Sequence, residues 1–252
     1  PARRADPADI DGQVTFDHVR FGYTPDKTVI HDFSCTVQPG QKVAIVGPTG
    51  AGKTTMVKLL MRFYDVDGGS ILVDGVDTKE MTRHELRDRF GMVLQDAWLF
   101  EGSIRDNIAY AQDNLPEEKI IAAARSASVD SFIKTLPGGY DFELSTGAEN
   151  ISQGQRQLLT IARAMASDPE IMILDEATSN VDTHTEQLIQ KALAKLMHGR
   201  TSFVIAHRLS TIRDADMILY MEHGDILEHG SHEELMAQHG KYEALYMSQF
   251  AQ

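Results

Sequence analysis

The sequence predicts an α/β fold with a mainly parallel sheet, an N-terminal antiparallel β subdomain and an inserted α-helical subdomain. Short apolar runs at 171–174, 201–206 and 217–221 alternate with segments long enough for helices, which is the pattern of a parallel sheet. Apolar residues alternate with polar ones within 14–37, as antiparallel strands require. Helix signals dominate 96–167, which indicates a helical insertion.

The first half of the chain supplies the antiparallel strands and the start of the core. The alternation at 14–37 leads into an apolar strand at 43–46, and a glycine-rich turn follows. Helical spacing then predicts a helix that continues until Gly68-Gly69 breaks it, with apolar positions at Met56, Leu59, Leu60 and Phe63. The capping-box pattern from Thr82 to Glu85 predicts a further short helix, which stops before a strand at 91–94.

The second half supplies the helical insertion and the remaining strands. Helix signals cover 103–109 and 116–126, and a loop is expected at 137–139. A second capping box at 231–234 opens a helical C-terminus that reaches Phe250.

The turn at 47–55 matches the phosphate-binding motif G-x-x-x-x-G-K-[ST] at every fixed position, and it lies between a strand and a helix as that motif requires. Glycines there allow successive N–H groups to point at an anion, and the helix N-terminus adds its dipole. In this motif Lys53 supplies charge to the outer phosphates and Thr54 a hydroxyl to Mg²⁺. We therefore predict a P-loop NTPase core rather than a chance glycine-rich turn, with a phosphate site formed by Gly47, Pro48, Thr49, Gly50, Ala51, Gly52, Lys53, Thr54 and Thr55.

Two carboxylates follow the apolar strand at 171–174. A strand of this kind delivers an Asp to Mg²⁺ beside the phosphates, which is the role we expect for Asp175. Glu176 can then orient a water or act as its general base. The alternative is an exposed acidic turn after a core strand.

A second glycine-bearing helix N-terminus occurs at Ile151-Ser152-Gln153-Gly154-Gln155. Such a terminus can bind an anion. It can equally be ordinary capping, with Ser152 as N-cap and Gln155 at the capping-box position.

Composition excludes several classes of protein. The 252 residues suffice for one compact unit with a subdomain, and the net charge of −13 disfavours binding to nucleic acid or anionic lipid. The single cysteine, Cys35, fits a reducing compartment. No apolar run approaches the roughly 20 residues of a membrane span, and no signal peptide is visible, so direct lipid insertion is not expected. The polar, Pro-containing residues 1–10 are typical of a linker.

Together with Tyr23, Gln95 and His207, these motifs make the chain resemble the nucleotide-binding domain of an ABC transporter of the export type. The resemblance runs from about residue 11 to the C-terminus. It implies that residues 1–10 are a linker from a preceding membrane domain. It also implies one ATP-binding domain at 11–252, with its core at 11–95 and 168–252 and a helical subdomain at about 96–167.

The resemblance implies a role for each further motif. Tyr23 would stack on adenine, Gln95 would reach Mg²⁺ and sense the γ-phosphate, and His207 would touch the γ-phosphate. Residues 151–155 would form the signature sequence, with Ser152, Gly154 and Gln155 at phosphate, and 179–182 the D-loop, which ends at Asp182. The catalytic set is then Glu176, His207, Lys53 and Gln95, and the metal ligands are Thr54, Gln95 and Asp175.

The resemblance also implies partners. A second nucleotide-binding domain would pair head to tail and bury two ATP molecules with Mg²⁺. A short helix of the transmembrane domain would contact the region near 98–100. The alternative is that these residues are an ordinary patch of the hydrophobic core. The domain would hydrolyse ATP at the cytoplasmic face of a membrane and power export of an unknown substrate.

One departure from the family pattern is visible, because Ile151 and Gln153 replace the first and third residues of the usual Leu-Ser-Gly-Gly-Gln signature. Three other hypotheses about the function stay open. A P-loop kinase shares 47–54 but gives no reason for the signature or His207. A soluble non-transport ABC ATPase, of the repair or translation type, would usually carry coiled-coil insertions or tandem domains. A regulatory nucleotide-binding module would lack turnover, against which Glu176 argues.

Overall fold

The computed structural model describes residues 12–94, 98–110, 112, 114–176 and 181–250. It divides the chain into two compact units. The first unit comprises Pro1–Phe90, Glu170–Glu176 and Gly199–Gln252, and the second comprises Gly91–Pro169 and Ala177–His198. Gln95 and residues 179–180 of the D-loop lie outside the described residues.

The antiparallel sheet of the first unit has the order β2-β1-β4-β5. Its strands are β1 (Val14–Thr24), β2 (Lys27–Val37), β4 (Gly68–Val73) and β5 (Val76–Asp77). β1 pairs antiparallel with both β2 and β4, so the predicted antiparallel subdomain is confirmed.

The larger sheet has the order β12-β11-β3-β10-β9-β6. Its strands are β12 (Asp225–Gly230), β11 (Met217–Glu222), β3 (Lys42–Val46), β10 (Thr201–Ile205), β9 (Ile171–Asp175) and β6 (Phe90–Val93), which starts where the first unit ends. β3, β9, β10 and β11 are parallel, which confirms the predicted sheet. The carboxyl ends of parallel strands meet at one edge, where open α/β sheets bind ligands.

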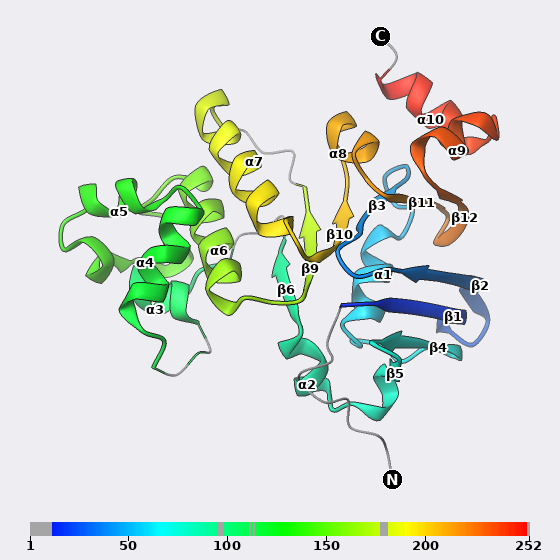
Figure 1. Ribbon diagram of the computed structural model, residues 1–252, viewed down its shortest axis with the longest axis horizontal. Coiled ribbons are helices and arrows are strands. Elements are labelled where there is room, and N and C mark those ends of the chain that lie inside the picture. The colour runs from blue at the N-terminus through cyan, green and yellow to red at the C-terminus, as the bar shows by residue number, and fades with distance from the viewer. Residues whose placement is uncertain (1–11, 95–97, 111, 113, 177–180, 251–252) are drawn as a thin grey trace. The chain divides into compact units, whose positions relative to one another are not determined.

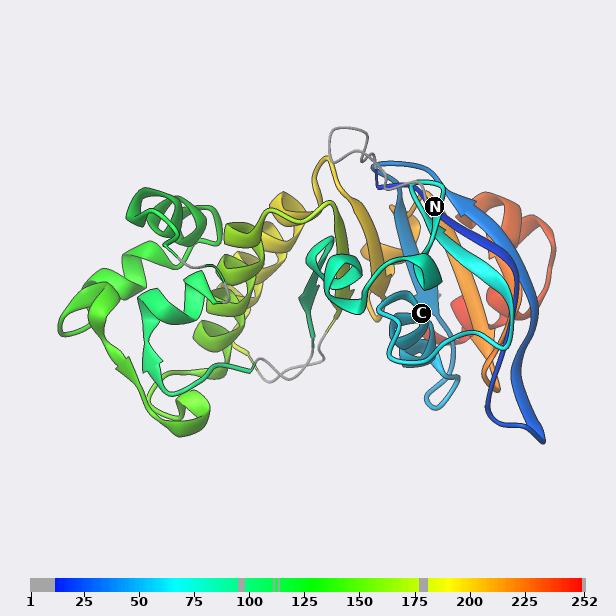
Figure 2. The ribbon, with the colours of Figure 1, turned by 90° about the horizontal axis from the view of Figure 1, so that it is seen from below.

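The two sheets of the first unit share a core. The buried rings of Phe16 on β1 and Phe203 on β10 meet edge to face with centroids 6.3 Å apart, and Phe33 on β2 meets His229 on β12 at 6.0 Å. The dark blue strands β1 and β2 accordingly lie beside the larger sheet both in Figure 1 and in the rotated view of Figure 2.

The described helices of the first unit include two that begin with the predicted capping boxes, at Thr82 for α2 and at Ser231 for α9. The N-cap side chain and the Glu three residues later satisfy each other's backbone N–H groups in both. The α-helices described in the first unit are α1 (Lys53–Leu60), α2 (Arg83–Asp88), α8 (Leu209–Arg213), α9 (His232–Ala237) and α10 (Lys241–Phe250).

Helix α1 ends at Leu60, and the expectation that it continues beyond Phe63 is wrong. Arg62 takes a left-handed conformation with φ 52°. The N–H of Phe63 bonds Lys58 O at 2.8 Å and that of Arg62 bonds Leu59 O at 3.1 Å, which together form a Schellman cap. Phe63 is consequently 48% exposed.

The second unit is mainly helical, and α6 packs against α3, α4 and α7 (Figure 1). Its helices are α3 (Ile104–Ala109), α4 (Glu117–Ser126), α5 (Asp130–Thr135), α6 (Gln153–Ser167) and α7 (Thr183–Met197), with a small pair of strands, β7 (Gly102–Ser103) and β8 (Glu143–Leu144). The helices predicted at 103–109 and 116–126 are present as α3 and α4. Across the described residues, no helix combines the length and apolar character that a membrane span needs.

Candidate functional site

The phosphate loop joins strand β3, which is buried from Val43 to Val46, to helix α1 within the first unit. Gly47, Gly50 and Gly52 have φ angles of 153°, 79° and 88°, as the motif predicts. A Cβ at Gly47 would lie 2.1 Å from the carbonyl oxygen of Met221, so only glycine fits there. The loop is further held by a hydrogen bond of 2.7 Å from the N–H of Gly224 to the carbonyl of Ala51.

Lys53 is the first residue of α1, and its side chain lies back along the loop. Its Nζ donates to the carbonyl oxygen of Gly47 at 2.8 Å. Burial lowers the pKa of Lys53, and the negative charge of Asp175 opposes that effect. The hydroxyl-bearing Thr54 is exposed beside it, whereas Thr55 is buried.

Asp175 ends strand β9 and lies near the His207 side chain. His207 Nε2 is 3.8 Å from Asp175 Oδ1. That oxygen is buried, and it has no hydrogen-bond partner among the residues that the structure describes. A buried carboxylate oxygen without a partner is costly, and a cation is what would satisfy it.

Glu176 is 5% exposed and is held by the start of helix α8. Its Oε2 accepts the backbone N–H of His207 at 2.9 Å and that of Arg208 at 3.1 Å. Its Oε1 accepts the hydroxyl of Thr211. This is not the exposed acidic turn of the alternative interpretation, because Glu176 is buried and both of its carboxylate oxygens accept hydrogen bonds.

Tyr23 lies near the end of strand β1, and its side chain is 47% exposed. Its hydroxyl is hydrogen-bonded to that of Thr55 at 2.7 Å. Phe21 and Tyr64 each meet its ring edge to face, with centroids 5.0 and 5.3 Å away. The structure thus brings the predicted base platform to the phosphate-loop helix.

The predicted signature sequence begins helix α6 of the second unit. Ser152 is its N-cap and forms a capping box with Gln155, through bonds of 3.2 and 2.9 Å. The capping that the sequence allowed is therefore present. A Cβ on Gly154 would lie 2.4 Å from Thr185 Cγ2 and 3.0 Å from Val181 Cγ1, so this glycine permits close packing on the segment that starts α7.

Asp182 caps α7 through its carboxylate, which accepts the N–H of Thr185 at 2.9 Å. That hydrogen bond lowers the pKa of Asp182. The part of the D-loop that the structure describes thus fixes the start of α7.

A family model described as "ABC transporter" matches residues 30–179, which is more than half of the chain. The chain belongs to the ABC transporter family.

Relatives of this ABC transporter domain include ATP-binding/permease proteins and a flippase. The fatty acid ABC transporter ATP-binding/permease protein of Mycobacterium bovis is 55% identical over 233 residues, which are 92% of this chain and 37% of that protein. The ATP-dependent lipid A-core flippase of Desulfotalea psychrophila is 48% identical over 236 residues, 94% of this chain and 41% of that protein. The chain therefore spans well under half the length of either.

A solved structure of a bacterial Atm1-family ABC exporter with ATP bound has a TM-score of 0.87 and 42% identity, covering 100% of this chain and 43% of that one. This match confirms the predicted P-loop NTPase fold. The chain is an ATP-binding domain of exporter-type ABC transporters, and such domains are ATPases.

Sequence reasoning did not identify two residues that contact this ABC transporter site. Thr211 donates to Glu176, and Tyr64 packs on Tyr23. Neither belongs to a motif with fixed spacing. The sequence offers one signal for Thr211, which is a polar residue at a buried position of the helix that follows His207.

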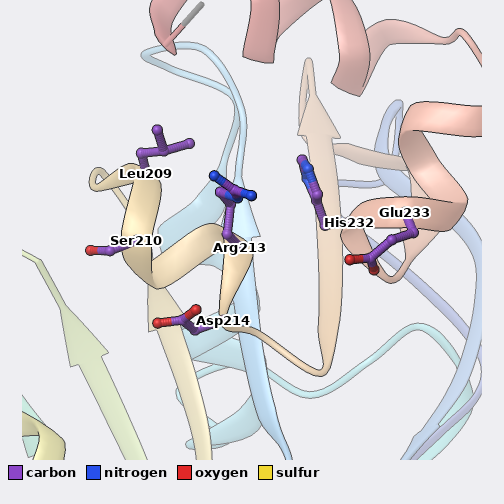
Figure 3. Close-up of a pocket in the computed structure, with 6 residues that line it drawn as sticks. All are labelled: Leu209, Ser210, Arg213, Asp214, His232 and Glu233. Atoms are coloured by element: carbon purple, nitrogen blue, oxygen red, sulfur yellow. The ribbon is translucent and has the colours of Figure 1, made fainter.

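Residues of α8 other than Thr211 border an open pocket of about 560 Å³ (Figure 3). Arg213 on α8 and His232 at the start of α9 flank it, and Asp214 and Glu233 place carboxylates on it as well. The Nδ1 of His232 is hydrogen-bonded to the Tyr242 hydroxyl at 2.9 Å. Groups of both charges thus line the pocket, which favours neither anions nor cations.

Proposed function

We propose that the first unit binds Mg·ATP at its phosphate loop and hydrolyses it with Glu176 as general base, and that this cycle powers export through an attached transmembrane domain. One observation carries the proposal: β3, β9 and β10 end at the same edge of one sheet. This places the phosphate loop, the pair Asp175-Glu176 and His207 together.

The phosphate loop offers positive potential to a triphosphate. Among the residues that the structure describes, the Lys53 ammonium group bonds only a carbonyl of its own loop, so it can exchange this contact for phosphate oxygens. The N-terminus of α1 adds its dipole and free N–H groups. Tyr23 offers an exposed ring face for the adenine base.

The residues present fit Mg²⁺. Asp175 Oδ1 is a buried oxygen that lacks a hydrogen-bond partner in the described part of the chain, and Thr54 is exposed in the first turn of α1. Hard oxygen ligands of this kind are what Mg²⁺ prefers. The ion would neutralise phosphate charge during transfer to water. Gln95 is a further proposed ligand and lies outside the described residues.

Glu176 is proposed to accept a proton from the attacking water. Its Oε2 is fixed by two backbone N–H groups, whereas Oε1 accepts one rotatable hydroxyl. Oε1 is therefore the oxygen that can be released toward water while Oε2 keeps the carboxylate in place. The His207 side chain, on the segment between β10 and α8 whose backbone N–H groups bind Oε2, is proposed to contact the γ-phosphate.

Dimerisation is proposed because the second anion-competent helix N-terminus belongs to the other unit of the chain. The first turn of α6 carries Arg156 and otherwise uncharged residues, and Ser152 at its start is exposed. In a head-to-tail pair, the phosphate loop of one subunit would face Ser152 and Gln155 of a second nucleotide-binding domain. Asp182, at the D-loop, is proposed to lie at the same interface.

The proposed contact for the transmembrane domain is an aromatic patch of the second unit. Trp98 and Tyr110 are 58% and 47% exposed, and the Arg163 guanidinium stacks on both. Arg163 also donates to the carbonyls of Trp98 and Asn107 at 2.9 and 2.8 Å. A preformed aromatic surface fits a short helix of a membrane domain, which would place this chain at the cytoplasmic face of the membrane.

Light scattering on the Glu176→Gln chain tests the proposal. With ATP the mass should double, and with ADP it should stay that of a monomer, since the γ-phosphate is what the partner contacts. Adding Ser152→Arg should prevent dimerisation without changing the Kd for ATP of the monomer. Equal masses in both nucleotides would refute the dimer, and loss of ATP binding in the Ser152 variant would refute the separation of the two sites.

A further inference from the structure

Tyr23 can act as a stacking platform only if the plane of its ring is fixed. A tyrosine near a strand end can turn about two side-chain torsions, and ordering it at the moment of binding costs free energy. The structure shows three contacts that restrict this ring, from Thr55, Phe21 and Tyr64.

The three aromatic rings form one cluster. Phe21 and Tyr64 also contact each other, with centroids 5.7 Å apart, so each ring of the cluster contacts the other two. Phe21 is 2% exposed and anchors the cluster in the core, whereas Tyr64 is 42% exposed and borders solvent as Tyr23 does. Tyr23 nevertheless keeps an exposed fraction of 47%, so its side chain remains accessible to a ligand.

Both ends of one helix supply the contacts. Thr55 lies in the first turn of α1, and Tyr64 follows its Schellman cap. Because α1 ends at Leu60, the chain turns there, and Tyr64 contacts Tyr23 of β1 instead of lying further along the helix axis. The element that begins with the phosphate loop therefore also sets the orientation of Tyr23.

We propose that Tyr64 is a positioning residue for nucleotide binding, which fixes the ring plane of Tyr23 so that the base and the triphosphate are held in register by the same helix. This inference rests on the proposed role of Tyr23 as base platform. Tyr64 acts through Tyr23 and need not touch ATP.

Binding of two probes by titration calorimetry tests the inference. ATP carries a base, whereas inorganic tripolyphosphate carries only the phosphates. Tyr64→Leu should raise the Kd for ATP about 2- to 10-fold, the range expected for loss of one aromatic pair. It should leave the Kd for tripolyphosphate unchanged, and Tyr64→Phe should restore parental ATP affinity because it keeps the ring.

The chain offers a matched control in the neighbouring Phe63, which is 48% exposed. Its ring lies under the Arg87 guanidinium at 4.6 Å, and in the described part of the chain it makes no ring contact with Tyr23. Phe63→Leu removes the same kind of side chain and should change neither Kd. If it weakens ATP binding as much as Tyr64→Leu does, the effect is not specific to Tyr64 and the inference is overturned.

A double-mutant cycle separates the inference from the proposal on which it rests. Tyr23→Ala should raise the Kd for ATP about 5- to 150-fold, and adding Tyr64→Leu to it should have no further effect. If Tyr23→Ala weakens binding but Tyr64→Leu does not, the positioning role is wrong and the platform stands. If Tyr23→Ala leaves the Kd unchanged, both fail. Equal losses for ATP and tripolyphosphate would show damage to the phosphate loop and overturn the inference.

Discussion

Replacing Glu176 by glutamine should separate ATP hydrolysis from ATP binding and from folding. The amide keeps the length and shape of the side chain. Its oxygen can still accept the N–H groups of His207 and Arg208, and its NH₂ can donate to the Thr211 hydroxyl, which also accepts. Only the basicity and the charge are lost.

The structure sets the size of each effect. Three hydrogen bonds to a charged acceptor become neutral ones. Charge-assisted bonds are worth about 1.5–3 kcal/mol against about 1 for neutral ones, but removing a buried charge returns desolvation energy. The free energy of unfolding should therefore fall by no more than about 2 kcal/mol, or about 8 °C in Tm. Loss of a general base should lower kcat by about 10²- to 10⁴-fold.

Three measurements on one preparation test this reasoning: phosphate release, the Kd for ATP and the melting temperature. Glu176→Ala is the control, since it leaves three donors unpaired at a cost of about 1–3 kcal/mol each before any water enters. It should melt below the glutamine variant. If Glu176→Gln hydrolyses ATP at near the parental rate, Glu176 is not the base.

Three further outcomes follow from contacts described above. Gly154→Ala should lower the free energy of unfolding by about 1–3 kcal/mol, because its Cβ overlaps Thr185 and Val181; an unchanged Tm would contradict that packing. Asn107→Ala should cost about 2–4 kcal/mol, since this fully buried amide bonds Phe100, Ser103 and Arg163, and urea unfolding measures the loss. Burial raises the pKa of Cys35 from 9.0 to about 12. Below pH 9 the thiol is protonated in both states, whereas between about 9 and 12 only the unfolded chain ionises, so stability should fall with rising pH in that window. Cys35→Ala should make stability fall less steeply in this window, and identical pH profiles for both chains would refute this prediction.

The fold and the phosphate loop could be predicted because their signals are local. The strand at 43–46, the positive-φ glycines and the capping boxes at Thr82 and Ser231 each depend on neighbouring residues only. The roles of the predicted site residues remain predictions, and Gln95 lies outside the described residues.

The end of α1 could not be predicted for a physical reason. The left-handed residue of a Schellman cap is usually glycine, which can be recognised in a sequence, but here that residue is Arg62. Its guanidinium donates to the carbonyls of Thr78 and Met81 at 2.9 and 2.7 Å, and these tertiary bonds offset the strain. Thr211 and Tyr64 were missed for a similar reason, because their partners are distant in sequence.

The packing of Gly154 explains where this chain can differ from its family. Gln153 is exposed in the first turn of α6, so a longer side chain there displaces only water. One residue later, even a methyl group would collide with Thr185. The tolerance for substitution therefore differs between two adjacent positions of the signature. Of the two departures from the usual sequence, Gln153 falls on the permissive position, whereas Ile151 is buried and replaces one apolar residue by another.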